Sequence, residues 1–232
     1  MFLVLLTLTS WTLFYYVLKR YNHMRSSEWN SRIVALMHAL LITKMVETCF
    51  FIGPWPYDSM GEANTLTQYV TMSISAGYFL FEIAWCVVMQ TEGFVMLLHH
   101  FISLTGLISS LYIDKCGSEV SAVIWGSELT NPFLQIRWFL RETKQYQTIF
   151  AYINDWLFFL TFAVVRVGIG ATLGYAMYFS VGTPIIVKIG GYLFYLIGLV
   201  WMYQIFKFAQ KRLFITPGRF IQMKRLKENK KL

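Results

Sequence analysis

Two adjacent histidines, His99 and His100, lie inside an unbroken apolar segment, residues 93–112, that is long enough to cross a membrane. An ionisable side chain at membrane depth costs roughly 2.5 kcal/mol or more on insertion scales, so it normally faces protein, water or a ligand inside a helix bundle. An unprotonated imidazole can act there as a general base or as a nucleophile. We therefore predict that the histidine pair belongs to a functional site.

A second polar row lies in the next apolar segment, where Glu128, Asn131 and Gln135 are spaced three and four residues apart and share one helix face. A carboxylate beside an imidazole fixes its tautomer and raises its basicity, so we assign His99, His100 and Glu128 to a catalytic group. Asn131 and Gln135 are predicted to bind the substrate in the same polar cavity. The alternative is a buried histidine–glutamate hydrogen bond that only orients two helices.

Helical geometry places His99 and Ser103 on one side of their helix, whereas His100 lies a quarter-turn away. We therefore expect His99 and Ser103 to face the cavity, Ser103 as a substrate-binding residue. His38 and Arg137 are also predicted to bind the substrate. The functional role considered for Arg137 is binding a lipid or coenzyme phosphate. The alternatives are a packing role for His38 and snorkelling of Arg137 to the membrane surface.

Four charged residues within apolar segments are assigned to structural ion pairs. Lys44 and Glu47 lie three residues apart and can pair within one helix. Glu82 has no such neighbour, so Arg166, which also lies near the middle of an apolar segment, is its predicted partner. The three cysteines lack the paired spacing of a zinc site, and we predict no disulfide framework and no metal site.

The composition indicates that these residues belong to a membrane protein. Of 232 residues, 56% are hydrophobic and only 14% are charged, which excludes an ordinary soluble domain. Apolar runs of about 20 residues predict an all-α, polytopic membrane helix bundle rather than a barrel of alternating strands. Seven candidate transmembrane helices cover residues 2–18, 33–53, 66–89, 93–112, 120–140, 156–179 and 185–208. Six is the alternative, because Glu128, Asn131 and Pro132 interrupt the fifth.

Charged residues in the connections predict the orientation of this bundle. The odd-numbered loops and the C-terminal tail carry most of the lysines and arginines, and basic flanks tend to remain cytoplasmic. We therefore expect an N-terminus that is lumenal or outside and a cytoplasmic C-terminus. The first apolar run is followed, not preceded, by basic residues, so we interpret it as a retained helix and not as a signal peptide.

Three regions are expected along the chain. Residues 1–26 form an N-terminal transmembrane helix with a basic loop, residues 27–212 form the main membrane domain, and residues 213–232 form a basic cytoplasmic tail. The tail could hold a short amphipathic helix after Pro217, with a solvated charge cluster as the alternative. Because many of the cations lie in this tail beside a membrane, the net charge of +8 indicates anionic lipids, and not nucleic acid, as partners.

Several motifs resemble the TLC-domain family, which includes translocating-chain-associated membrane proteins and ceramide synthases. They are Ser27-Glu28-Trp29, Gly53-Pro54-Trp55-Pro56, His99-His100 and the segment 126–143, GSELTNPFLQIRWFLRET. In ceramide synthases the histidine pair and a downstream Asp-x-x-Asp belong to the active-site motif. The resemblance implies that His99 and His100 keep the pair and that Glu128 stands near the first aspartate. Asn131 departs from the second.

The resemblance implies two functions. The first is a ceramide-synthase-like acyltransferase that moves acyl groups from acyl-CoA, as co-substrate without a bound cofactor, to a sphingoid base or phospholipid amine. The second is a non-catalytic lipid-binding regulator of membrane composition. It also implies a location in the endoplasmic reticulum or Golgi rather than the plasma membrane, although the terminal lysines are one position out of register for a dilysine retrieval signal. A homo-oligomer is compatible with this interpretation.

Overall fold

The computed structural model describes residues 1–90 and 92–215. This part of the chain is built from helices, with an isolated β-bridge between Ala63 and Lys115. In chain order the elements are α1 (Phe2–Tyr21), α2 (Ser27–Ile52), α3 (Leu66–Met89), α4 (Phe94–Ile113), α5 (Gly117–Glu128), α6 (Asn131–Glu142), α7 (Ile149–Thr161), the π-helix η1 (Phe162–Ile169), α8 (Gly170–Phe179), α9 (Ile185–Ala209) and the π-helix η2 (Gln210–Ile215).

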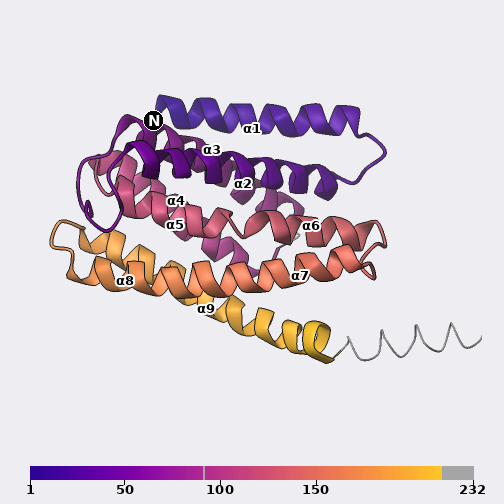
Figure 1. Ribbon diagram of the computed structural model, residues 1–232. Coiled ribbons are helices and arrows are strands. Elements are labelled where there is room, and N and C mark those ends of the chain that lie inside the picture. The colour runs from indigo at the N-terminus through magenta and orange to yellow at the C-terminus, as the bar shows by residue number, and fades with distance from the viewer. Residues whose placement is uncertain (91, 216–232) are drawn as a thin grey trace, which may run out of the picture.

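The predicted all-α membrane bundle is confirmed. Six helices in the described residues are long and apolar enough to span a membrane: α1, α2, α3, α4, the continuous run Ile149–Phe179 and the run Ile185–Arg212. The fifth predicted span exists as two shorter helices, α5 and α6, which lie end to end and parallel to the others (Figure 1). Counted together they make a seventh pass along the bundle, and the start of α1 and the end of α9 lie at opposite ends of it (Figure 1).

Most predicted helix boundaries differ from the observed ones by a few residues. The third prediction, residues 66–89, matches α3, whereas the sixth begins at Ile149 and not at residue 156. The helix includes Asn154 and Asp155, whose side chains are buried inside the bundle, where they form hydrogen bonds and ion pairs. Thr148 caps this helix by accepting a hydrogen bond from the Ala151 amide at 3.3 Å. The amphipathic helix predicted after Pro217 lies outside the described residues.

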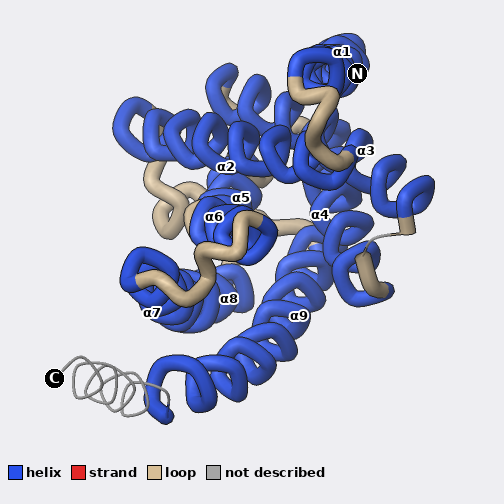
Figure 2. Tube along the Cα trace, turned by 90° about the vertical axis from the view of Figure 1, so that its right-hand side faces the viewer, coloured by secondary structure: helices blue, strands red, loops and turns tan. Residues whose placement is uncertain are grey.

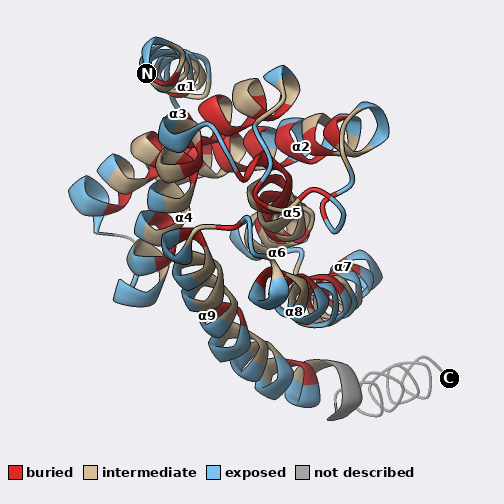
Figure 3. Cartoon of the chain, turned by 90° about the vertical axis from the view of Figure 1, so that its left-hand side faces the viewer, coloured by how far each residue is buried: buried red, intermediate tan, exposed pale blue. Residues whose placement is uncertain are grey.

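The broken helix α5–α6 occupies the centre of the bundle. Viewed from the end, it is surrounded by α2, α4, α7, α8 and α9, and α1 lies at the periphery (Figure 2). Buried residues concentrate on α2, α3 and α5 (Figure 3). Large apolar side chains on the outward faces, such as Leu6, Leu157 and Leu196, remain 50%, 43% and 55% exposed, which is the surface that a lipid environment covers. The polar row of the fifth span is therefore held away from lipid.

The outermost helix, α1, is attached to α3 at Gly77. A side chain at this position would collide with Thr7 and with the backbone of Leu8, so only glycine lets the two helices approach this closely. Thr7 Oγ1 donates to the Ser73 carbonyl at 2.9 Å, and Trp11 Nε1 donates to the Ile74 carbonyl at 3.2 Å. Side-chain hydrogen bonds thus replace the hydrophobic driving force that is missing between helices in lipid.

The break between α5 and α6 follows from the sequence around Pro132. Proline has no amide hydrogen to continue the helical ladder and disfavours helical geometry in the preceding residue, so α5 ends at Glu128 and Pro132 lies in the first turn of α6. The last carbonyl groups of α5 need new donors. Thr130 Oγ1 donates to the Ser127 carbonyl at 3.0 Å, which meets part of that need.

The two ends of the bundle differ in charge. One end gathers the basic connections α1–α2 and α6–α7 and the end of α9, and is called here the basic end. At the opposite end, buried Glu119 accepts hydrogen bonds from the Gly61 amide at 2.9 Å and from Thr183 Oγ1 at 2.8 Å. These bonds join two connecting loops to the start of α5.

Cys116, in the loop before α5, should be unreactive in the folded protein. It is fully buried, and burial together with the nearby Glu119 carboxylate raises the pKa of its thiol to about 12. With this pKa almost no thiolate is present at pH 7, and the thiolate is the form that reacts. We expect no maleimide labelling of Cys116 in a variant that retains only this cysteine, and full labelling after denaturation. Rapid labelling of the folded variant would contradict this packing.

Candidate active site in the polar cavity

A cavity of about 370 Å³ contains most of the predicted site residues. It lies between α2, α3, α4, α6, η1 and α9, and His99, His100, Glu128, Asn131 and Gln135 all line its wall. The lining continues to the basic end of the bundle. There Arg32 forms ion pairs with Glu28 at 3.1 Å and Glu92 at 2.7 Å. The cavity therefore connects polar groups at membrane depth with the charged surface at one end.

The two histidines point to different neighbours within this cavity. Their ring centroids are 5.6 Å apart, and both side chains belong to residues that are at least nine-tenths buried. His99 packs against Phe194 and Trp201 of α9, with ring centroids 4.7 Å and 4.8 Å away. His100 instead faces α3 and lies 5.6 Å from the ring of Phe79. Both border the cavity, as predicted, but in different chemical surroundings.

The polar row of the fifth span is a chain of hydrogen bonds that crosses the helix break. Asn131 Nδ2 donates to Glu128 Oε2 at 3.2 Å, and Gln135 Nε2 donates to Asn131 Oδ1 at 2.8 Å. Gln135 Oε1 is buried without a hydrogen-bond partner. The row thus faces the cavity with a carboxylate at one end and an unused acceptor at the other.

The histidine nearest to Glu128 is His38, and not His99 or His100 as predicted. His38 Nδ1 lies 3.4 Å from Glu128 Oε2. This distance is within the range of an ion pair but is long for a hydrogen bond. The imidazole is fully buried and stacks on Tyr78 with ring centroids 3.7 Å apart. His38 does not line the cavity, and its contact with substrate stays a prediction. It lies behind Glu128 and can position that carboxylate.

The predicted ion pair between Glu82 and Arg166 does not form. Arg166 Nη2 donates to the Ser127 carbonyl at 2.8 Å, and its Nε donates to Thr130 Oγ1 at 3.1 Å. The guanidinium was assigned to a carboxylate because both lie mid-span, but the carbonyl groups freed at the helix break are closer. Arg166 therefore supplies the donors that the end of α5 lacks. Among the described residues, no carboxylate lies within ion-pair distance of it.

Arg166 also marks the boundary between two cavities. A second cavity of about 370 Å³ lies between α5, η1, α8 and α9, and its lining is almost entirely apolar. Ser127 and Arg166 line both cavities. The π-helix η1 carries Arg166, and such single π-helical turns occur frequently at functional sites. Ser103, predicted to bind substrate, lines neither of these cavities and donates to the His99 carbonyl at 2.8 Å.

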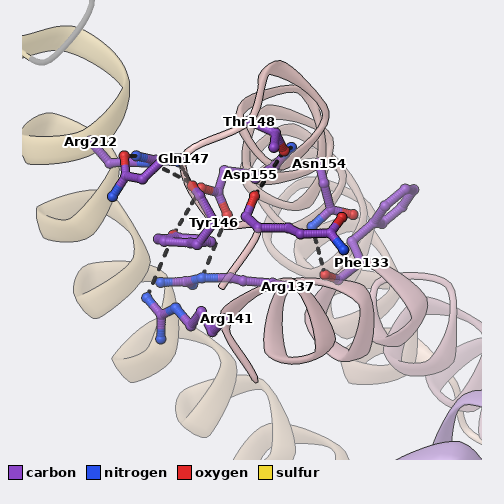
Figure 4. Close-up of polar contacts among 11 residues, drawn as sticks. Phe133, Arg137, Arg141, Tyr146, Gln147, Thr148, Asn154, Asp155 and Arg212 are labelled. Atoms are coloured by element: carbon purple, nitrogen blue, oxygen red, sulfur yellow. Dashed lines mark hydrogen bonds and ion pairs between the residues drawn. The ribbon is translucent and has the colours of Figure 1, made fainter. Parts of the chain in front are cut away.

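Arg137 turns inward and does not snorkel. Its Nε lies 3.5 Å from Oδ1 of Asp155, whose carboxylate is fully buried, and its side chain is only 14% exposed. The same carboxylate accepts hydrogen bonds from Tyr146 at 2.9 Å and from Arg212 Nε at 3.2 Å (Figure 4). Arg212 also donates to the Tyr146 carbonyl at 2.6 Å. These contacts join α6, the loop to α7 and the end of α9 at the basic end.

Sequence reasoning missed this cluster. Asp155 and Arg212 are 57 residues apart, and no periodic pattern relates them. The signal that was available is an aspartate inside an otherwise apolar stretch, because such a residue needs a partner. The local pair predicted from spacing does form: Lys44 Nζ lies 2.6 Å from Glu47 Oε2.

Three kinds of chemical group line the polar cavity. His99 offers an imidazole, the row from Glu128 to Gln135 offers acceptors for a donor such as an amine, and Arg166 offers a buried positive charge. An imidazole and a fixed cation are the parts that acyl transfer uses, as nucleophile or base and as the partner of a developing oxyanion. The adjoining apolar cavity can take a hydrocarbon chain.

Comparisons with known proteins agree with the fold. A family model described as TLC domain matches residues 28–207, more than half of the chain. TLC domain-containing protein 4 A of Dictyostelium discoideum is 25% identical over 154 residues, which is 64% of this chain and 58% of that protein. TLC domain-containing protein 2 of Danio rerio is 25% identical over 143 residues, or 60% of this chain and 57% of its own length. The chain thus covers less than two thirds of each relative.

Proposed function

Because the chain belongs to the TLC-domain family of membrane proteins, linked in general to lipid metabolism, we propose that it is a lipid acyltransferase. The donor is acyl-CoA, and the acceptor is the amine of a sphingoid base or phospholipid. One observation carries the proposal: the polar cavity that holds His99 adjoins an apolar cavity of the same volume at Ser127 and Arg166. A ligand with a polar reactive group and a long hydrocarbon chain fits such a pair.

In the proposed reaction His99 is the nucleophile that attacks the acyl carbonyl carbon. Its ring nitrogen attacks the thioester, the carbon–sulfur bond breaks, and the thiolate of coenzyme A leaves with the proton that the imidazole releases. The lipid amine then attacks the acyl-imidazole, and its proton passes to the departing ring nitrogen as the amide forms. In the alternative, His99 removes the amine proton during direct attack on the thioester.

Arg166 is placed to stabilise the negative charge that develops on the carbonyl oxygen. Its guanidinium lies 5.7 Å from the ring centre of Trp201, and the His99 ring packs on the same tryptophan. A fixed cation in a site without bulk water stabilises an oxyanion more than it would in water. The absence of a carboxylate partner within 4 Å, among the described residues, leaves its charge available for this role.

The row from Glu128 to Gln135 is the proposed site of the lipid amine. A neutral amine carries N–H donors whose hydrogen bonds the Glu128 carboxylate and the free Oε1 of Gln135 can accept, and it keeps the lone pair that attacks the acyl group. His38 positions Glu128 from behind, and so acts on the amine only through that carboxylate. Because the row and His99 line the same cavity, an amine bound there would share the space with the histidine that carries the acyl group.

We also propose an orientation and a subgroup. The basic end faces the cytoplasm of the endoplasmic reticulum or Golgi membrane, so that acyl-CoA reaches the polar cavity from that side, with Arg32 and Arg137 near its phosphates. Within the family, the segment 126–143 resembles TLC domain-containing protein 5, also called transmembrane protein 136. The location rests on family resemblance.

A second candidate function is a non-catalytic lipid-binding regulator of membrane composition. Asn131 favours it, because this position corresponds to the second aspartate of the ceramide synthase motif and carries an amide here. The amide is engaged between Glu128 and Gln135. A protein that only binds lipid would use the same pair of cavities.

Acyl transfer by purified protein tests the first function against the second. Labelled acyl-CoA is offered with a panel of sphingoid bases, lysophospholipids and amino phospholipids, and Lys44→Gln, at a 78% exposed side chain, serves as a control. Amide product from the wild type and the control, with a raised KM for the amine in Glu128→Gln, supports the transferase. No product across the panel, with lipid still co-purifying, overturns it in favour of the regulator.

Filling the apolar cavity should shorten the acyl chain that the protein accepts. Gly198 lines this cavity, and a Cβ atom at its position meets nothing within 4 Å, so Gly198→Leu projects into free space. We expect binding of long-chain lipids to weaken about tenfold or more while short chains bind normally. Gly93→Leu is the matched control, because this exposed glycine also has free space and lines none of the described cavities. Equal chain-length profiles would mean that the chain lies elsewhere.

A further inference from the structure

The strongest unexplained feature is a group of three buried side chains between α3 and α4. Glu82 and Cys86 are four residues apart on α3, so they lie on the same face, and His100 reaches them from α4. One ligand atom from each residue lies within 4.8 Å of the other two. All three residues are more than nine-tenths buried.

Two polar atoms of this group lack hydrogen-bond partners, although the Glu82 carboxylate also interacts with the Tyr78 hydroxyl. Glu82 Oε1 and His100 Nδ1 are buried without a hydrogen bond, and no described lysine or arginine lies within ion-pair distance of Glu82. Burying a carboxylate without a compensating charge costs several kcal/mol as an order of magnitude, so such a group normally has a cation beside it. The assigned partner, Arg166, binds Ser127 and Thr130 instead. A cation is therefore the missing component.

The donor set identifies the class of cation. Carboxylate, thiolate and imidazole together are ligands for zinc and related transition metals, whereas magnesium and calcium select oxygen ligands. A divalent ion bound to the Glu82 carboxylate and the Cys86 thiolate gives a site with no net charge, because the thiol proton is released on binding. A neutral site avoids the cost of charge at membrane depth.

We propose that Glu82, Cys86 and His100 bind one zinc ion. Zinc bonds of about 2.0 to 2.3 Å hold tetrahedral ligand atoms less than about 4 Å apart. Side-chain rotations that bring the three ligand atoms about 1 Å closer together therefore give the geometry that zinc requires. Three protein ligands with a free fourth position are typical of catalytic zinc sites. Glu82 and His100 line the polar cavity, so the fourth position faces the space where a lipid carbonyl would lie. This assignment makes His100 a metal ligand, distinct from His99.

Cobalt substitution tests the site without any measurement of acyl transfer. A Cys49→Ser, Cys116→Ser double variant retains Cys86 as its sole cysteine and should bind one Co²⁺ per chain. We expect thiolate-to-cobalt charge transfer in the near ultraviolet and visible bands of a tetrahedral ion, both abolished by zinc. The isosteric Glu82→Gln change should weaken zinc binding by more than about 100-fold, beyond the roughly 10- to 100-fold cost of losing an outer partner of a metal ligand.

The controls separate this site from adventitious metal and from misfolding. Cys86→Ser should lose the charge-transfer band, whereas Cys49→Ser alone should keep it, and melting temperatures of the apo proteins verify that each variant folds. Absence of the band in the folded double variant, or zinc bound equally by wild type and Glu82→Gln, would overturn the proposal. The protein could bind cobalt without transferring acyl groups, or transfer acyl groups without binding cobalt. The two experiments therefore test the zinc site and the proposed function separately.

Discussion

If the protein is the proposed acyltransferase, we expect His99→Ala to lower kcat about 10³-fold, while the helical fold and the melting temperature stay close to those of the wild type. The size follows from the loss of a nucleophile or general base, which typically contributes about 10² to 10⁴ in rate. The ring packs on Phe194 and Trp201, and its Nδ1 is buried without a hydrogen-bond partner, so its removal breaks no ion pair. The measurement is initial rate with saturating acyl-CoA and amine.

His23→Ala is the matched control, because this histidine lies in the exposed α1–α2 connection, and it should keep the wild-type rate. If His99 carries the acyl group, short incubation with labelled acyl-CoA and no amine leaves a hydroxylamine-sensitive label on the wild type and none on His99→Ala. A folded His99→Ala variant with unchanged rate would remove His99 from the mechanism. Label absent from an active wild type would select the general-base alternative.

The sequence predicted the helices well because a membrane constrains them strongly. Uninterrupted apolar runs of about 20 residues have few alternatives to a spanning helix, and Pro132 beside Glu128 and Asn131 indicated where one helix breaks. The start of α7 was missed because the predicted span followed the apolar run, which begins only after the polar residues Asn154 and Asp155. Only the distant partners Phe133 and Arg212 explain why they are buried.

Sequence reasoning placed five of the predicted residues, His99, His100, Glu128, Asn131 and Gln135, in one cavity, but it did not predict their pairings. Periodicity places residues on a helix face, so the row from Glu128 to Gln135 and the local pair of Lys44 and Glu47 were accessible from spacing. Pairing between helices depends on their rotation and relative height, which periodicity leaves open. Glu128 therefore met His38 instead of His99.

Arg166 illustrates the same limit from another side. A charge-matching argument assigned it to Glu82, because both are ionisable and mid-span. In the structure the backbone carbonyl groups at the end of α5 lack hydrogen-bond donors. Arg166 donates to one of them, the Ser127 carbonyl, and a carboxylate could not do so. Among the described residues Glu82 therefore has no lysine or arginine within ion-pair distance, and the zinc proposal supplies a cation for its carboxylate.

Asp155→Asn should lower the free energy of unfolding by about 3 to 5 kcal/mol, the cost of breaking a buried ion pair by removing one partner. Asparagine keeps the size of the side chain and can still accept the hydrogen bond from Tyr146. It removes the negative charge that Arg137 and Arg212 share, and those side chains are only 14% and 11% exposed, so two cations remain without a counterion. The measurement is thermal or denaturant unfolding in a fixed detergent.

Two further variants distinguish charge imbalance from a general packing defect. Asp58→Asn, in an exposed loop at the opposite end of the bundle, should change stability by less than about 0.5 kcal/mol. Adding Arg212→Gln to Asp155→Asn removes one of the two unpaired cations, so the double variant should regain part of the lost stability. Equal stability of Asp155→Asn and the wild type would mean that the arginines find water or lipid phosphate without this carboxylate. A double variant less stable than either single one would show that Arg212 holds α9 mainly through its bonds to Tyr146 and Gln147, and not through Asp155.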